Sequence, residues 1–209
     1  VSLRHVIALA GTMNVLWFKR DLRLSDHAPL AHCANAGPFV ALYVYEPAIM
    51  ASPEYGANQH AFINDCLDDL GQRMAALGGQ LHRVHASICD ALDALHQIEP
   101  IEGLYSHMET GNDLTFQRDK AVKHWCRARG VRWTEVPTVE VCRPHPSRDG
   151  WSRRWHTQVR KRPAPSPTAL TAVALPTLPS AVEALSCEEA GLGPPAARVQ
   201  AGGRARAEE

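Results

Sequence analysis

Short runs of β-forming residues alternate with amphipathic helical patterns along most of this chain, and this alternation constrains its fold more than any other feature. Strict alternation of strands with helices calls for crossover connections, which are right-handed in parallel sheets. The sequence therefore predicts an α/β fold with a doubly wound sheet of five parallel strands. The expected strands are rich in Val, Leu, Tyr, Phe and Trp and lie at residues 14–18, 39–45, 81–85, 103–107 and 131–136.

Three helical patterns lie between these runs. The clearest covers about Asn58 to Leu77, where apolar residues recur at spacings of three and four. A second pattern opens at Ser87, which together with Asp90 resembles a capping box. A third runs from near Asp113 to Arg129 and is expected to stop at Gly130, because glycine commonly ends helices.

Composition limits the partners of the chain. Lys plus Arg equals Asp plus Glu at 22 each, so no overall field draws it to nucleic acid or to an anionic membrane, and any such contact needs a local patch. The 6 cysteines show no C-x-x-C spacing, which favours a reducing cytoplasm. No apolar stretch approaches the ~20 residues of a membrane span.

The character of the sequence changes towards its end. Residues 163–209 carry most of the prolines, many alanines and no sustained apolar stripe, so they cannot bury a core of their own. We therefore predict an N-terminal extension at residues 1–12, an α/β domain at 13–140, and an irregular Pro- and Ala-rich linker or tail at 141–209. Within the tail, Ala174–Leu192 could dock on the domain as a loop or a short helix.

Two polar loops are expected to meet at one edge of the sheet. In an open sheet of Rossmann-like order, ligands bind at the carboxyl ends of the strands where the order reverses, between strands one and four. The loops after these strands are Lys19–Asp26 and Ser106–Asp113, and both are dense in charge. The candidate cofactor-binding residues are Lys19, Arg20, Asp21, Arg23, His107, Glu109, Asn112 and Asp113.

The same charges have a structural interpretation, which the sequence leaves open. They could pair with one another to hold the loops in place, while Ser25 and Asp26 suit an N-cap and Asn112 or Asp113 would stabilise the start of the next helix. We expect no metal site and no catalytic residue in this chain. His82 and His85 lie three apart on a strand and so face opposite sides, which argues against a shared metal.

Two sequence blocks carry a resemblance to a known family. The segment from Leu16 to Asp26 resembles the opening of the photolyase/cryptochrome family. Ser106–Asn112, followed by Arg118-Asp119 and Trp125–Val131, resembles a block of bacterial photolyase-like proteins. The resemblance covers about residues 13–160. It implies the N-terminal α/β domain of such a flavoprotein, with the strand order three, two, one, four, five.

In that family this domain precedes a larger helical domain that holds the catalytic FAD. The resemblance therefore implies that the chain stops before the helical FAD domain, that this domain and, through the parent protein, DNA are its partners, and that FAD belongs to the parent protein only. The parent activity would be blue-light repair of pyrimidine dimers or photoreception. The chain alone is expected not to be catalytic.

The same resemblance implies that the domain could hold an antenna chromophore: a folate, a deazaflavin, FMN or none. In folate-binding photolyases an Asn-Glu pair contacts the pterin, and Asn112-Asp113 is the nearest equivalent. Two other functions stay open. One is a stand-alone nucleotide-binding domain, which would need a glycine loop after strand four, where only Thr110-Gly111-Asn112 stands. The other is an interaction module that binds no small molecule.

A basic segment follows the predicted domain. Residues 143–162 contain seven Lys or Arg and one acid, with Trp151 and Trp155 among them. This pattern has two interpretations. It could contact nucleic acid through phosphates and base stacking, or it could be a linker helix whose Trp residues pack against a partner domain.

Overall fold

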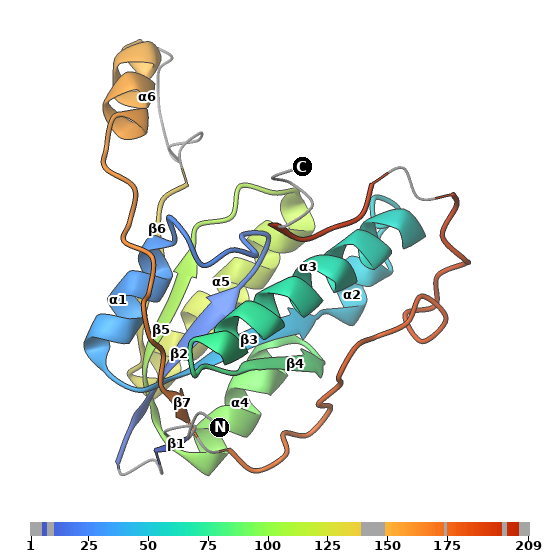
Figure 1. Cartoon of the computed structure of the whole chain (residues 1–209), viewed down its shortest axis with the longest axis horizontal. Helices are drawn as coiled ribbons and strands as arrows, with labels where there is room; N and C mark the ends of the chain where they lie inside the picture. Colours follow the sequence, from blue (N-terminus) through green and yellow to red (C-terminus); the bar gives the residue numbers. More distant parts are fainter. Residues whose placement is uncertain (1–5, 8–10, 139–148, 174, 198–199, 205–209) are drawn as a thin grey trace.

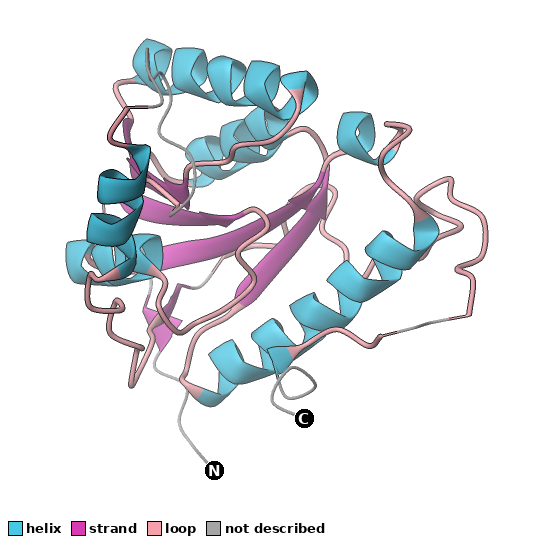
Figure 2. Ribbon diagram, turned by 90° about the horizontal axis from the view of Figure 1, so that it is seen from above, coloured by secondary structure: helices cyan, strands magenta, loops and turns pink. Residues whose placement is uncertain are grey.

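The centre of the molecule is a parallel sheet with helices on both faces (Figures 1 and 2). The structure, a computed structural model, describes residues 6–7, 11–138, 149–173, 175–197 and 200–204. The five long strands run in the order β4-β3-β2-β5-β6 and are all parallel. The predicted fold class and strand order are therefore confirmed. The strands are β2 (Met13–Phe18), β3 (Phe39–Tyr45), β4 (Leu81–His85), β5 (Ile101–His107) and β6 (Arg132–Val136).

Two very short strands extend the sheet beyond the predicted five. β7 (Ala172–Val173) pairs with the start of β3, and β1 (Val6–Ile7) pairs with β7. Residues from both ends of the chain thus meet at the amino edge of the sheet (Figure 1).

The sheet is apolar on both faces because its strands are covered on both sides. On β2, Met13, Val15 and Trp17 face one layer, and Leu16 and Phe18 face the other, as the two-residue period of a strand requires. The first layer contains α4 (Ile88–Ile98) and α5 (Asp113–Arg129). The second contains α1 (Ala28–Ala36), the single-turn α2 (Pro47–Met50) and α3 (Ala57–Ala76).

The helix ends follow local chemistry, with one correction. Ser87 caps α4 by accepting from the Asp90 amide at 3.1 Å, and Gly130 ends α5 with a left-handed φ of 69°, both as predicted. At α1, however, the predicted caps Ser25 and Asp26 are wrong, and the capping residue is His27. Pro29 at the second helical position has no N–H, so the ring of His27 caps the helix through the next amide, that of Leu30, at 3.0 Å.

The tail docks on the domain, and the described part of the predicted segment Ala174–Leu192, residues 175–192, forms no helix. Leu170, Leu178 and Leu185 are buried in the two cores. The Leu185 carbonyl accepts hydrogen bonds from His60 Nε2 at 2.6 Å and from Asn64 Nδ2 at 2.8 Å. The tail therefore passes β7, follows the β4 edge and returns along α3 (Figure 1). The domain boundary predicted at 140/141 lies outside the described residues.

The last described residues are held against α3. The Gly202 amide donates to Asp65 Oδ2 at 3.0 Å, and the Gly203 amide donates to Cys66 Sγ at 3.3 Å. A Cβ at Gly202 would lie 2.4 Å from the Phe62 carbonyl oxygen, and Gly203 has a φ of 102°, so both positions require glycine.

We expect Leu185→Ala to lower the free energy of unfolding by about 2–5 kcal/mol. The side chain is 3% exposed, so its truncation leaves a cavity under the tail, while the two hydrogen bonds to its carbonyl remain. Urea unfolding of the whole chain measures the change, and Thr177→Ala, at an exposed tail position, is the control. Equal stabilities for the two variants would contradict the docking of the tail.

Candidate functional site

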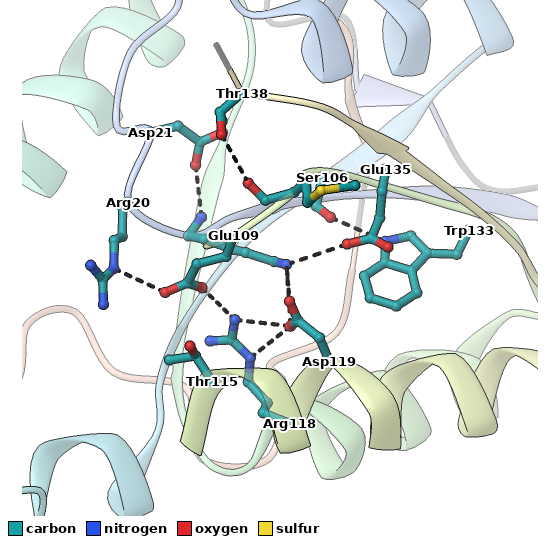
Figure 3. A network of polar contacts seen from close by, with 12 residues as sticks. Arg20, Asp21, Ser106, Glu109, Thr115, Arg118, Asp119, Trp133, Glu135 and Thr138 are labelled. Atoms are coloured by element: carbon teal, nitrogen blue, oxygen red, sulfur yellow. Dashed lines mark hydrogen bonds and ion pairs between the residues drawn. The ribbon is translucent and has the colours of Figure 1, made fainter. Parts of the chain in front are cut away.

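Charged side chains from four strands converge at the carboxyl edge of the sheet. Lys19 and Asp21 follow β2, Glu46 follows β3, Glu109 follows β5, and Glu135 lies near the end of β6. Parallel strands deliver all these residues to one edge, where ligands bind in open α/β sheets. Figure 3 shows the resulting network, with the start of α5 beneath it.

Arg118 on α5 is the centre of this network. Its guanidinium lies 2.9 Å from Glu46 Oε1 and 2.9 Å from Asp119 Oδ1, and it also donates to Glu109 Oε2. Arg20 approaches the other oxygen of Glu109 at 2.9 Å from the opposite side (Figure 3). Burial opposes the charge of Arg118, but the carboxylates outweigh it and raise the pKa of this guanidinium above its ordinary value.

Lys19 forms the second buried cation of the site. Its Nζ lies 3.2 Å from Asp119 and 3.9 Å from Glu135, and 4.3 Å from the centre of the Trp17 ring. Burial lowers the pKa of Lys19, and these carboxylates offset part of that effect. The Arg118 guanidinium also lies over Trp17, at 4.8 Å, so two cations share one aromatic ring.

Asp21 joins three parts of the chain. Its Oδ1 accepts from the Lys19 amide at 2.9 Å, its Oδ2 lies 2.8 Å from His27 Nε2, and the same oxygen accepts a hydrogen bond from His107 Nδ1. Burial alone would raise the pKa of this carboxyl, but the hydrogen bonds from His107 and His27 outweigh burial and hold it well below its usual range. Asp21 therefore remains ionised.

The group Asp21, His27 and His107 has the residue types and spacing of a metal site. Its hydrogen bonds favour a different role. His27 Nδ1 accepts from the Leu30 amide at 3.0 Å, so its proton lies on Nε2, and a metal ion at Nε2 would require the imidazolate form. Both rings already contact one carboxylate oxygen. The group is a buried triad in which Asp21 contacts both imidazoles, and it joins the loop after β2, the start of α1 and the end of β5.

Two cavities open at this edge of the sheet. The first, of about 530 Å³, lies between the loop after β2, the ends of β3, α2 and α3, and the start of α5. The second, of about 1160 Å³, lies between the loops after β2, β5 and β6 and the helix α6 (Trp151–Val159). The loop Lys19–Arg23 and Glu109 contribute to both, so the single predicted crevice is two cavities that share a wall.

The structure brings together most of the predicted site residues. Lys19, Arg20, Asp21, Arg23 and Glu109 line both cavities, His107 lines only the second, and Asn112 lines only the first.

Asn112 and Asp113 stand at the start of α5. Asn112 caps the helix by accepting from the Thr115 amide at 3.2 Å, and its Nδ2 donates to Glu54 at 2.6 Å. Asp113 is exposed, accepts from Gln117 and lines neither cavity. The pairing and capping interpretation therefore describes many contacts of these residues, and their ligand-binding role stays a prediction.

Sequence reasoning missed several residues of the site. Glu46 directly follows the second predicted strand, and Glu135 lies near the end of the fifth. A search extended to the ends of these two predicted strands would have found both residues. Arg118 and Asp119 lie one and a half turns into α5, and only the rotation of that helix shows that they face the strand ends. No simple pattern marks His27.

The chain matches known proteins of one family. The family model described as DNA photolyase matches residues 14–167. A deoxyribodipyrimidine photo-lyase of Halobacterium salinarum is 26% identical over 93% of this chain and 44% of its own length. Cryptochrome-1 of Arabidopsis thaliana is 27% identical over 58% of this chain and 18% of its own length. The chain thus spans less than half the length of these relatives.

Solved structures share the fold. A Synechocystis cryptochrome has a TM-score of 0.68 at 18% identity, covering 90% of this chain and 41% of its own. An archaeal photolyase from Sulfolobus tokodaii has a TM-score of 0.61 at 14% identity, covering 78% of this chain and 38% of its own; it is described as holding two FAD molecules, with the implication of a novel light-harvesting cofactor.

We expect the stability of the protein to fall between pH 7 and pH 5, and His27→Asn to weaken that dependence. Burial lowers the pKa of His27 in the folded state. As the pH falls through about 6.5, the unfolded chain therefore binds a proton that the folded chain resists, and unfolding becomes more favourable. Asparagine keeps the N-cap but cannot titrate.

Urea unfolding at the two pH values measures this effect. The loss of stability between pH 7 and pH 5 should be smaller in the variant than in wild type, because the pKa of His27 is lowered in the folded state. Ser87→Asn, a change of cap at α4, is the control because it leaves His27 in place. An equal loss in His27→Asn and wild type would show that His27 does not titrate on unfolding in this range.

Proposed function

This chain belongs to the DNA photolyase family, and from this membership we propose that it is the N-terminal antenna domain of a photolyase or cryptochrome-like flavoprotein. In this role the domain holds a light-harvesting chromophore in the first cavity and supports the part of the parent protein that carries FAD. The chain itself supplies no catalytic group.

The observation that carries the proposal is the apolar wall of the first cavity. The stripe of α3 is divided: Leu67, Leu70 and Met74 are buried in the core, while Phe62 and Ile63 line the cavity. Phe62 is 39% exposed. An amphipathic helix normally buries its apolar stripe, and apolar surface left in a concave site is typical of ligand binding.

Aromatic side chains form another part of the lining. Tyr43, Tyr45 and Tyr55 line the same cavity, and Trp17 lies at its floor beneath Lys19 and Arg118. Flat conjugated rings pack well against such side chains. Folates, deazaflavins and FMN all contain a ring system of this kind, so the wall suits this class of chromophore without selecting one member.

The mouth of the cavity supplies polar contacts. Arg20 is 69% exposed at its side chain and lines the cavity with Arg23, so an anionic group on the chromophore would meet two cations. Glu54 and Asn112, which bond to one another, offer an acceptor and a donor to a polar ring edge. The Sulfolobus tokodaii photolyase, with its described light-harvesting cofactor, supports the proposal by likeness of fold.

The parent activity is part of the same proposal. Relatives named photo-lyase and cryptochrome match the chain over less than half of their length. We infer that the FAD and the cavity for the DNA lesion lie in a further helical domain of a cytoplasmic parent protein, which acts either in repair of pyrimidine dimers or in light signalling. Among the described residues, no helix is long and apolar enough to cross a membrane.

We expect Ser52→Trp to abolish chromophore binding and Thr110→Trp to preserve it. Ser52 lines only the first cavity and Thr110 lines only the second, and both are partly exposed, so a large side chain fills one space without disturbing the core. Titration of a folate, a deazaflavin and FMN against the whole chain, followed by chromophore fluorescence, measures binding.

Two results would contradict the proposal. One is the absence of binding by all three chromophores in the unmodified chain. The other is binding that Thr110→Trp removes and Ser52→Trp leaves intact, because it would assign the chromophore to the second cavity. Asn112→Ala separates contact from capping: loss of the cap alone lowers stability by about 1 kcal/mol and leaves the affinity unchanged.

A further inference from the structure

The second cavity carries an excess of positive charge, although the chain as a whole has none. Seven Lys or Arg side chains line it, against three carboxylates. Three of the cations, Lys19, Arg20 and Arg23, come from the loop after β2, and four, Arg153, Arg154, Lys161 and Arg162, come from α6 and the residues after it. The cavity is therefore a local basic surface of the kind that polyanions need.

All three carboxylates are already engaged. Asp21 is held by two histidines, Glu109 by Arg20 and Arg118, and Asp26 accepts from the Ala164 amide at 2.9 Å. They are poorly placed to neutralise the wall formed by α6.

The cations of the α6 wall are less engaged. Within the described part of the chain, Arg153, Lys161 and Arg162 have no carboxylate within ion-pair distance. The α6 wall thus carries free positive charge, in addition to Arg23 in the loop after β2, whose guanidinium donates only to the Asp26 carbonyl among the described residues.

The same side presents two tryptophans. Trp151 is 52% exposed and Trp155 is 36% exposed, and their rings are stacked with centres 6.3 Å apart and planes 22° apart. α6 stands away from the layers of the sheet (Figure 1), so no described helix covers these rings. Large aromatic surfaces exposed beside unpaired cations are typical of binding sites and not of a solvated helix.

We propose that the cleft between α6 and the strand-end loops binds single-stranded nucleic acid. Arg153, Lys161 and Arg162 contact phosphates, and Trp151 and Trp155 stack on unpaired bases. Charge complementarity selects a polyanion, and the tryptophan faces select one that carries accessible aromatic rings. A duplex, with its bases stacked inside, does not offer them. The two cavities share a wall, but none of these five contact residues lines the chromophore cavity, so the proposal does not depend on a bound chromophore.

Fluorescence anisotropy of a labelled oligothymidylate with the whole chain at low salt tests the proposal. We expect Trp155→Ala to weaken binding about 5- to 150-fold, the factor that corresponds to about 1–3 kcal/mol of stacking per base. The ring is exposed, so the fold should persist, and an unchanged melting temperature verifies this.

Salt dependence tests the phosphate contacts. Each phosphate neutralised on a single strand contributes about 0.7 to the slope of log K against log salt concentration. The double change Arg153→Gln with Arg162→Gln should therefore reduce the magnitude of that slope by about 1.4 while weakening binding.

The chain offers a matched control on α5. Phe116 is 48% exposed and Lys120 Nζ lies 5.3 Å from its ring centre, so this pair has the same chemistry but lines neither cavity. Phe116→Ala with Lys120→Gln should leave affinity and slope unchanged.

The proposal would be overturned if the oligonucleotide did not bind at salt concentrations of roughly 50 mM or less, or if a duplex bound more tightly. Equal losses of affinity in the control and in the α6 variants would also overturn it. So would competition by polyglutamate as effective as by unlabelled oligothymidylate, because that would indicate an acidic protein partner. Ser52→Trp distinguishes the two functions, since it should remove chromophore binding and leave oligonucleotide binding intact.

Discussion

The arrangement of the functional edge depends on one buried carboxylate. Asp21 receives the Lys19 amide, His27 and His107, and so connects the loop after β2 with the start of α1 and the end of β5. Burying an ionised carboxylate without partners would cost several kcal/mol. The loop must therefore take the one path that brings both imidazoles to Asp21. That path also directs Lys19 inward to Asp119 and leaves Arg20 at the surface.

The ion pairs around Arg118 have a consequence for recognition. Because Glu46, Glu109 and Asp119 neutralise Arg118 and share the site with Lys19, the buried charges of the first cavity are largely satisfied by one another. A ligand there would gain little from these groups and must rely on the aromatic and apolar walls. The second cavity differs, since its cations on α6 lack such partners among the described residues. Two neighbouring spaces thus favour two kinds of ligand.

Much of the fold was predictable because it depends on periodicity, whereas the site depends on helix rotation and long-range contacts. The caps Ser87 and Asn112 and the end of α5 follow from local patterns, whereas the strand order was implied by the family resemblance, and the structure confirms all of them. His27 was missed because an N-cap histidine is uncommon and only Pro29 explains it. The sequence could not predict that Leu185 docks against α3, because a segment without apolar periodicity does not indicate which surface will cover it.

The two glycines near the end of the described residues pack against the part of α3 that also lines the first cavity. Gly202 and Gly203 lie against Phe62 and Cys66, with no room for a side chain at Gly202, and Phe62 and Cys66 also line the first cavity. The cavity wall and the anchor of the last described residues are therefore built on the same two turns of α3, so a substitution at Phe62 or Cys66 would act on both at once.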